Sequence, residues 1–298
     1  MRWPGAGGRD RRQALRSFLA ARLDEQVNNF SVVMQGLRAR LFNLQNTRRA
    51  WRVGEHHYDL GNDFFAAMLD SHLTYSCGYW AEANSLEAAQ TAKLDLICRK
   101  LGLQPGMRLL DIGCGWGSLR CAGLPVEFRL QDYREFNRSG HQRFERVASV
   151  GMFEHVGRKN HQGFFEMVRR SVSDDGVFLL HTIGRNAGRI PTDPWIDRHI
   201  FPNCELPSLS QIFDSCEQGF LIEDVQHFGA DYDPTLLAWH ERFEQAWPSF
   251  APRYGERFRR MWRFYLLACA GSFRARVNQL WQLVLSPKGV PCGYRRQL

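Results

Sequence analysis

The sequence predicts an α/β fold, with a parallel sheet covered by helices on both faces, in a chain of 298 residues. The hydrophobic segment 107–112 ends directly in the glycine-rich turn Gly113–Gly117. Further apolar segments of strand length alternate with segments of helical period, which is typical of strand–helix–strand units. After Pro191 the texture changes to loops rich in proline and aspartate and then to aromatic–arginine helices, which predicts a mixed subregion after about residue 185.

The first elements in chain order are helical. Residues 10–50 have a helical period, and residues 51–63 are polar and rich in turn-forming residues. A helix is predicted from Asn84, with Glu87 at capping-box spacing and Gly102 as its C-terminal stop. Its buried stripe is expected at residues three to five apart, namely Leu86, Ala89, Leu94, Ile97 and Leu101.

Strands and helices then alternate. The predicted strands are short apolar runs bounded by turns: 107–112, 126–130, 146–151, 177–183 and 279–285. The predicted helices have an apolar or aromatic period: 162–172, 239–247 and 253–270. We therefore expect two regions, a basic helical segment over residues 1–50 and one α/β unit over residues 51–298.

Positive charge is concentrated at the N-terminal end. The first 52 residues hold eleven arginines, no lysine and three acids, so they account for the whole net charge of +8. Leu15, Phe18, Leu19 and Leu23 stand at helical spacing among them, which suits an anionic lipid surface. A solvated arginine-rich helix and an organelle-targeting segment are the alternatives. Nucleic acid is not an expected partner, because no recognition motif accompanies the charge.

The cysteines and the apolar runs predict a cytoplasmic protein without a membrane span. The eight cysteines form no C-x-x-C pair, which is typical of reduced thiols, and no metal site is expected. The longest apolar run, 264–270, is far shorter than the roughly 18 residues that cross a bilayer.

The glycine turn is a candidate ligand site. Gly113, Gly115 and Gly117 let the backbone approach a ligand and adopt positive φ, and the helix expected after them offers free N–H groups. The spacing G-x-G-x-G, with Asp111 two residues before the first glycine, fits adenosylmethionine better than a dinucleotide. An ordinary tight turn is the alternative.

A second candidate follows the predicted strand 126–130. Gln131 and Asp132 come directly after it, and an amide beside a carboxylate can bind an adenine edge. A strand-ending turn explains the pair equally well.

Longer motifs resemble the signature blocks of bacterial cyclopropane-fatty-acid synthases, in the family's order from about residue 14 to about 286. The blocks are 55–63 (EHHYDLGND), 73–80 (LTYSCGYW), 151–157 (GMFEHVG), 178–184 (FLLHTIG), 229–233 (GADYD) and 268–276 (ACAGSFRAR). The resemblance implies a Rossmann-like class I methyltransferase sheet with a helical N-terminal remnant and a lipid pocket after about residue 185. It implies methyl transfer from S-adenosyl-L-methionine to a cis double bond in an acyl chain of an intact phospholipid at a membrane surface.

The resemblance also implies the site residues. Members of this family hold a bicarbonate ion as base, and its ligands map onto the main-chain N–H groups of Cys77 and Ile183 and onto the side chains of Glu154, His181 and Tyr232. The cofactor contacts map onto Tyr58, Tyr75, Ser76, Gly113, Gly115, Gln131 and Asp132. Cys269 matches a cysteine near the family's active site.

The implied chemistry explains these residue types. An alkene is a weak nucleophile, and its attack on a sulfonium methyl leaves a carbocation until a base removes a proton and the ring closes. The pocket must therefore be apolar, exclude water and hold an anionic base, and aromatic faces can stabilise the cation. Taken singly, the same residues have plainer interpretations. Glu154 with His155 suits a surface loop, His181 suits a core, and Tyr232 and Cys269 suit packing.

The sequence departs from the family at two places. The family's lipid-associated N-terminal region is represented only by its trailing helices, over residues 14–50, which is expected to weaken membrane docking or dimer contacts. Only thirteen residues lie between Gly117 and Gln131, too few for a helix, a strand and a second helix, since one crossover takes at least about 10–12 residues.

About thirty residues, with most of the first helix and the entire second strand, are therefore missing. We expect segment 126–130 to pair directly with segment 107–112. We also expect weak binding of adenosylmethionine, because the second strand normally carries the group that binds the cofactor ribose.

The leading expectation is a cyclopropane-fatty-acyl-phospholipid synthase, cytoplasmic and peripheral at the inner membrane face, with a homodimer left open. A related enzyme would add a methyl branch to the same double bond. A catalytically impaired paralogue would bind membrane or a full-length partner. A small-molecule methyltransferase would need a polar acceptor site, and the aromatic–arginine helices fit a lipid better.

Overall fold

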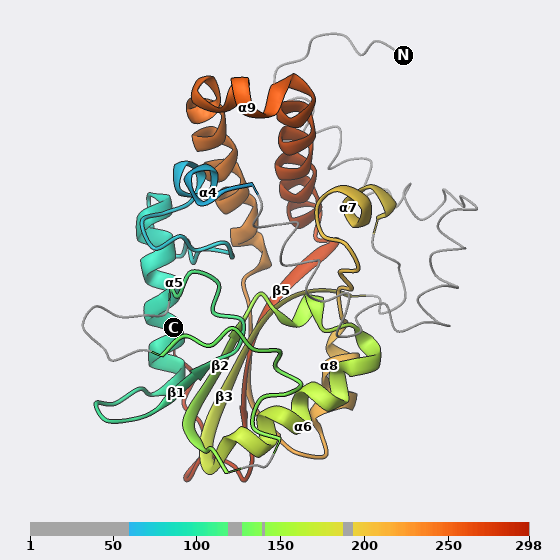
Figure 1. Ribbon diagram of the computed structural model, residues 1–298. Helices are drawn as coiled ribbons and strands as arrows, with labels where there is room; N and C mark the ends of the chain where they lie inside the picture. Colours follow the sequence, from blue (N-terminus) through green and yellow to red (C-terminus); the bar gives the residue numbers. More distant parts are fainter. Residues whose placement is uncertain (1–59, 119–126, 139–140, 187–192, 298) are drawn as a thin grey trace.

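A single mixed sheet organises the chain in the computed structural model, which describes residues 60–118, 127–138, 141–186 and 193–297 (Figure 1). The strand order is β1-β2-β3-β5-β4. The strands are β1 (Leu109–Asp111), β2 (Phe144–Val150), β3 (Val172–Arg185), β4 (Leu221–His227) and β5 (Asn278–Ser286). β1, β2 and β3 are parallel, whereas β5 runs antiparallel to both of its neighbours.

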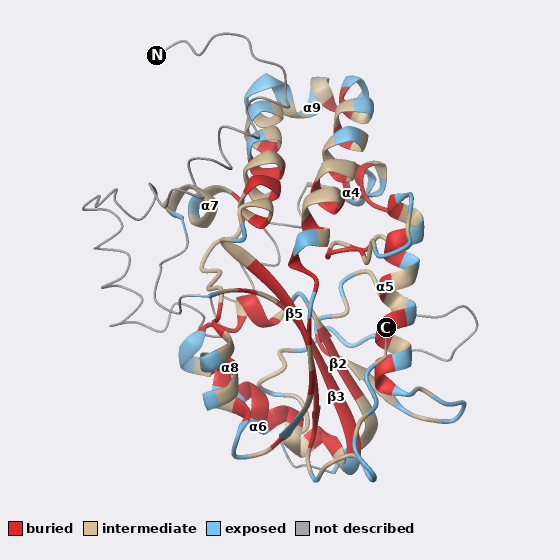
Figure 2. Cartoon of the chain, turned by 180° about the vertical axis from the view of Figure 1, so that it is seen from behind, coloured by how far each residue is buried: buried red, intermediate tan, exposed pale blue. Residues whose placement is uncertain are grey.

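Helices cover both faces of this sheet, as predicted. α5 (Leu86–Leu101) packs on one face through Ile97 and Leu101. α6 (His161–Ser171) and α8 (Leu209–Cys216) pack on the other. Figure 2 shows β2, β3 and β5 largely buried between these layers.

A separate aromatic core lies beyond one end of the sheet. The long helix α9 (Tyr232–Arg274) bends at Gly255, where φ is 71°, and so forms two arms (Figure 1). α4 (Asn62–Met68) packs against these arms through Phe64. The ring of Phe64 lies 5.2–6.0 Å from six other rings, those of Phe65, Phe243, Phe250, Tyr254, Phe258 and Trp262.

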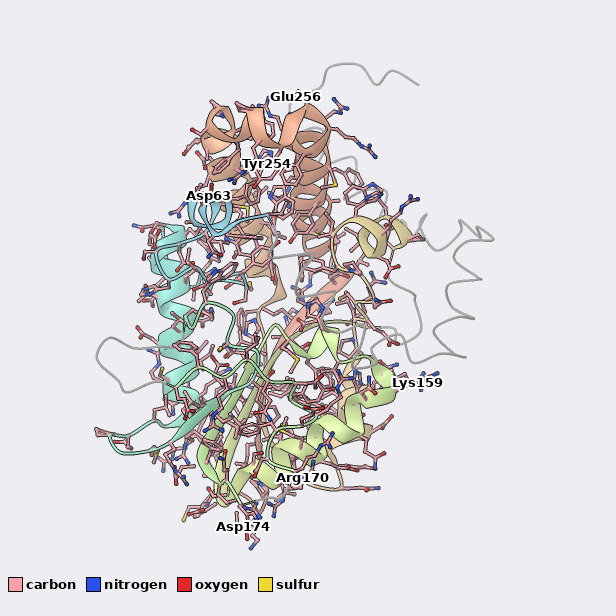
Figure 3. The ribbon with its side chains drawn as sticks, in the orientation of Figure 1. Asp63, Lys159, Arg170, Asp174, Tyr254 and Glu256 are labelled. Carbon is pink, nitrogen blue, oxygen red and sulfur yellow. The ribbon has the colours of Figure 1, made fainter. Side chains whose placement is uncertain are left out.

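The bend of α9 is tied to α4. Figure 3 shows Asp63 of α4 and Tyr254 of α9 at the same end of the molecule. Arg253 pairs with Asp63 at 2.9 Å, and the hydroxyl of Tyr254 donates to the carbonyl of Leu60. Both predicted aromatic–arginine helices fall within α9.

Short elements connect these parts. α7 (Pro194–His199) begins at Asp193, whose carboxylate accepts from the amides of Trp195 and Ile196. Single 3₁₀ turns occupy Phe153–His155, Arg158–Asn160 and Gly229–Asp231. In the described ranges, no helix combines the length and the apolar character needed to cross a membrane.

α5 was predicted with small errors at its start. Its N-cap is Ser85, whose hydroxyl accepts from the amide of Ala88, so the predicted capping box is wrong. Glu87 instead accepts from Ser71 and pairs with Arg242 at 3.0 Å. Gly102 ends the helix in the left-handed conformation, as predicted (φ 56°).

The predicted strand 126–130 is wrong. Residues 127–130 have no strand conformation, and β1 pairs with β2, not with this segment. Phe128 is 53% exposed and Leu130 is 90% exposed. The physical reason is the gap: a third strand needs the second strand as its neighbour, and without it residues 127–130 pair with no strand of the described sheet. β1 is consequently an edge strand of the described sheet.

The N-terminal predictions fall outside the described residues. This holds for the basic helices over residues 10–50 and for the proposed cofactor contact Tyr58.

Candidate active site

A cavity of about 220 Å³ lies at the carboxyl ends of β1, β2 and β3. Its walls come from segment 73–76, α5, the glycine turn, the ends of β1, β2 and β3, segment 193–206 and α9. In a parallel sheet the carboxyl edge is where ligands bind, because the loops there converge from several strands. The predicted residues Tyr75, Ser76, Asp111, Gly113, Gly115, Glu154, Ile183, Tyr232 and Cys269 all line this cavity.

The three glycines of the turn have the positive φ values expected of them. Gly113, Gly115 and Gly117 have φ values of 83°, 53° and 80°. A Cβ atom on Gly113 would lie 2.6 Å from Cβ of Met152, so no larger residue fits there. Gly117 is covered differently, since a Cβ atom on it would lie 2.7 Å from the ring of Phe128. Gly113 and Gly115 line the cavity, and Gly117 does not.

Alanine at Gly113 should destabilise the protein more than alanine at Gly151. Both glycines have positive φ, which costs an alanine about 1–2 kcal/mol, but a Cβ on Gly151 meets nothing within 4 Å. The clash with Met152 should add about 1–3 kcal/mol to Gly113→Ala. Urea unfolding of the two variants measures the difference, and equal midpoints at equal slopes would show that the turn relaxes freely.

Asp111 presents a buried carboxyl group to the cavity. Its Oδ1 atom has no hydrogen-bond partner among the described residues. Burial raises its pKa to about 7, and the positive charge of Lys93 opposes that shift. An unsatisfied acceptor of this kind fits a ligand that brings a donor or a positive charge.

Lys93 is a site residue that the sequence did not reveal. It is fully buried on α5, and its ammonium donates to the hydroxyl of Ser76 at 3.2 Å. Burial lowers its pKa to about 8, while Asp70, Cys77 and Asp111 act in the opposite direction. The only hint in the sequence was its place four residues after Ala89 and four before Ile97, both in the predicted buried stripe, and the fold was needed to show the burial itself.

Segment 73–76 is held by polar and aromatic contacts. The hydroxyls of Tyr75 and Tyr265 lie 2.8 Å apart, and the ring of Tyr75 lies 5.1 Å from that of Trp239. The side chain of Gln90 donates to the carbonyl of Ser76 at 2.8 Å. Tyr75 and Ser76 therefore stand in fixed positions between the glycine turn and α9.

Glu154 and Ile183 are joined directly. Oε1 of Glu154, which is only 3% exposed, accepts from the amide of Ile183 at 2.6 Å. Oε2 of Glu154 has no partner in the part of the chain that the structure describes. Burial raises the pKa of this carboxyl to about 7, against the lowering effect of the Ile183 hydrogen bond.

The raised pKa of Glu154 predicts that the stability of the folded protein depends on pH. The group has a pKa of 4.5 in its ordinary state and about 7 when folded, so the folded protein binds the proton more tightly. The stability that the protonated Glu154 carboxyl contributes is fully present below about pH 4.5 and is lost as the pH rises through about 7. Between pH 5 and pH 8, the unfolding free energy of the wild type should fall relative to that of Glu154→Gln by roughly 2–3 kcal/mol. Denaturant titrations at both pH values test this, and a constant difference would show that Glu154 is ionised throughout.

Tyr232 and Cys269 of α9 line the cavity, whereas the predicted ligand Cys77 is buried and does not line it. The ring of Tyr232 stacks on Phe273 with centroids 4.5 Å apart. Cys77 is fully buried, and its thiol donates to the carbonyl of Gly78. Burial raises the pKa of Cys269 to about 12 and raises the pKa of Cys77 as well, so both stay thiols.

His181 lies on β3 beneath the cavity and does not line it. The imidazole is 1% exposed, and its Nδ1 atom contacts the side-chain amide of Gln282 at 3.1 Å. Its Nε2 atom has no partner among the residues described. Burial lowers the pKa of this histidine well below its usual value, so the ring is neutral.

Two predicted cofactor contacts stand apart from the cavity. Gln131 is exposed, and Asp132 is held by Arg134 through contacts of 2.8 and 2.5 Å. Neither residue belongs to the cavity wall. The missing strand explains this position, because the segment that carries them has lost its place in the sheet. Their binding role stays a prediction.

Comparison with known proteins gives consistent matches. The family profile described as mycolic acid cyclopropane synthetase matches residues 45–125 and 120–283. The cyclopropane-fatty-acyl-phospholipid synthase of Escherichia coli (strain K12) is 51% identical over 305 positions, covering 93% of this chain and 78% of the relative. A probable fatty acid methyltransferase of Pseudomonas putida is 37% identical, covering 77% and 67% respectively.

Two solved structures of cyclopropane synthases are also similar to this chain. The cyclopropane synthase MmaA2 from Mycobacterium tuberculosis matches with a TM-score of 0.72 and 29% identity, over 79% of this chain and 97% of that one. Mycolic acid cyclopropane synthase CmaA1 complexed with SAH and CTAB matches with a TM-score of 0.71 and 29% identity, over the same shares.

The matches also bear on the gap. The two parts of the profile match meet at residues 120–125, between Gly117 and Gln131. An alignment of 305 positions to a chain of 298 residues requires positions at which this chain has no residue. Both findings agree with a segment missing after the glycine turn.

Proposed function

The chain belongs to the mycolic acid cyclopropane synthetase family, and we propose that it transfers a methylene group from S-adenosylmethionine to a cis double bond of a phospholipid acyl chain, forming a cyclopropane ring with bicarbonate as base. One observation carries the proposal. A single cavity brings the glycine turn and Asp111 together with Glu154, Tyr232 and the aromatic side chains of α9.

The cofactor end of the cavity has suitable groups. Gly113 and Gly115 allow close approach of a nucleoside to the backbone, and the unsatisfied Asp111 carboxyl suits a positively charged amino group. Ser76 and Lys93 offer donors to a carboxylate. When bound there, adenosylmethionine would supply an electrophilic methyl group on a sulfonium sulfur.

The acceptor end is apolar and aromatic. Trp239, Tyr265 and Phe273 line it together with aliphatic side chains such as Leu236. These walls exclude water, which protects a carbocation from capture, and their ring faces can stabilise its charge. These side chains would hold the double bond beside the bound cofactor, which would supply the methyl group and leave with the carbon–sulfur bonding electrons on its sulfur. The proton lost from the added methyl on ring closure would pass to the bicarbonate base.

An oxyanion has candidate partners at the cavity. Glu154, whose buried Oε2 has no partner in the described chain, lines the cavity together with Tyr232. His181, whose buried Nε2 also has no partner among the described residues, lies beneath the cavity, so an anion would have to sit deep enough to reach it. Glu154 can accept the proton of a bicarbonate ion, and the other two can donate to it. Two predicted ligands fit less well: the Ile183 amide already donates to Glu154, and Cys77 does not line the cavity. An anion bound there would have to share that amide.

Membrane contact is the expected way to reach an acyl chain. Arg257, Arg260 and Phe264 follow one face of α9 at exposed positions. Phe264 is 52% exposed and lies edge-on to Trp195, with centroids 4.6 Å apart, beside the cavity-lining Ile196. Arginines beside aromatic rings suit the interface of an anionic bilayer. We place the protein at the cytoplasmic face of the inner membrane, and a homodimer stays a prediction.

A catalytically impaired paralogue is the second candidate. The exposed Gln131 and the edge position of β1 favour it, because both follow from the missing segment. The buried residues Glu154, His181 and Tyr232, which match the family's site, favour an active synthase.

Fatty-acid analysis distinguishes these functions. The protein is expressed in cells that make unsaturated phospholipids but no cyclopropane rings, and the fatty esters are separated by gas chromatography. A ring product supports the synthase, and a methyl-branched product supports the related methyltransferase. Unchanged esters in cells that contain folded protein would support the impaired paralogue.

A further inference from the structure

A buried chain of hydrogen bonds runs from α5 through β5 to β3. The ammonium of Lys100 donates to Oε1 of Gln282 at 2.8 Å, and Nε2 of Gln282 contacts Nδ1 of His181 at 3.1 Å. Lys100 and His181 are 1% exposed, and Gln282 is fully buried. Gln282 and His181 are direct cross-strand partners, so the backbone sets their spacing.

The chemistry of these groups fixes where the histidine proton lies. An ammonium group only donates, so the amide of Gln282 must turn its oxygen toward Lys100. The amide nitrogen, which also only donates, therefore faces Nδ1 of His181. That atom must offer a lone pair, and a neutral imidazole then carries its single proton on Nε2.

We propose that Lys100 and Gln282 are positioning residues that hold His181 in the Nε2–H tautomer, so that its buried Nε2 atom donates to an oxyanion in the active site. This inference rests on the proposed function for the identity of the anion. The tautomer itself follows from the contacts of Lys100, Gln282 and His181, whatever the function of the protein. Nε2 is the ring atom that has no partner among the described residues.

The position of Lys100 is otherwise difficult to explain. Burying an ammonium group is unfavourable unless it is paired and hydrogen-bonded. The charged groups around it are Asp224 of β4 and Arg296 of the C-terminal segment, and Arg296 pairs with Asp224 at 2.5 Å. The hydroxyl of Tyr294 donates to the main-chain carbonyl of Lys100 at 3.1 Å and does not contact the ammonium. The ammonium donates to Gln282. Because the ammonium of Lys100 is buried and can only donate, it fixes the orientation of the Gln282 amide.

Nitrogen NMR of the full chain labelled with ¹⁵N-histidine tests the proposal. His181 is assigned by comparison with a His181→Gln sample. In the unmodified protein we expect its proton on Nε2. In Lys100→Met and in Gln282→Leu the restraint is lost, so the Nδ1–H form should appear. Tyr294→Phe is the matched control, because it removes a neighbouring hydrogen bond without touching the ammonium, and it should keep the original tautomer.

Activity gives a second readout. The apparent KM for added bicarbonate should rise about 10-fold or more in Lys100→Met, because an oxyanion then loses a buried donor, while high bicarbonate restores much of kcat. Tyr294→Phe should leave both constants within about two-fold. A proton on Nδ1 in the unmodified protein, or an unchanged tautomer in folded Lys100→Met, overturns the proposal. An Nε2–H histidine in a protein that modifies no lipid would instead contradict the proposed function.

Discussion

Restoring the segment missing between Gly117 and Gln131 should raise the affinity for S-adenosylmethionine by about 100-fold. The change inserts the residues that the E. coli relative carries at this place. The inserted strand would pair with the free edge of β1 and bring an acidic group to the cofactor ribose, and hydrogen bonds to a charged group contribute about 1.5–3 kcal/mol each. Isothermal titration of both proteins with the cofactor measures the change.

A flexible insert is the matched control. A glycine–serine segment of equal length, placed at the same position, supplies neither a strand nor an acid and should leave the affinity low. Ordinary micromolar binding by the unmodified chain would show that the remaining groups, with Asp111 and Ser76 among them, suffice. The account of the gap would then be wrong.

Replacing Glu154 with Gln should lower methyl transfer to unsaturated phospholipid by at least about 100-fold at saturating cofactor. Glutamine keeps the size of the side chain and can still accept from the Ile183 amide. It cannot take the proton of a bound bicarbonate ion, so the base is lost or misoriented. The rates are measured both in the unmodified chain and in the chain with the restored segment, so that weak cofactor binding cannot hide the effect.

Glu205 provides the control for that experiment. Its carboxylate accepts from the amide of Arg158, and its own amide donates to the carbonyl of Glu154, but its side chain does not line the cavity. Glu205→Gln should retain the rate within about two-fold. If Glu154→Gln kept full activity beside it, the carboxyl would have no part in the reaction.

The sequence was sufficient to predict the sheet where pattern and turn chemistry agree. The strand before Gly113 and the strand ending near Ile183 both combine an apolar run with a defined stop, and both were found. Gly102 ends α5 as expected, because only a left-handed residue can end the helix in this way. The segment 126–130 failed because its alternation is strand-like while its neighbour is missing. Pairing is a tertiary property that a local pattern cannot show.

Some residues of the candidate site were predicted from the sequence, and others were found only in the structure. Glu154, Ile183 and Tyr232 are far apart in the sequence, and only the resemblance to a family joined them before the structure did. Lys93 and Lys100 escaped prediction because buried lysines are rare, and a lysine on a helix is normally assigned to its solvated face. Their burial depends on partners from other elements, so only the assembled fold reveals it.

Transfer of label from S-[methyl-³H]adenosylmethionine to vesicles of unsaturated phospholipid, with bicarbonate present, tests the central claim most directly. Vesicles of the corresponding saturated phospholipid serve as the blank. The account predicts lipid-bound label only with the unsaturated vesicles, at a rate that rises when the missing segment is restored and falls at least about 100-fold with Glu154→Gln. Equal label in both kinds of vesicle, or none from a restored chain that binds the cofactor, would contradict it.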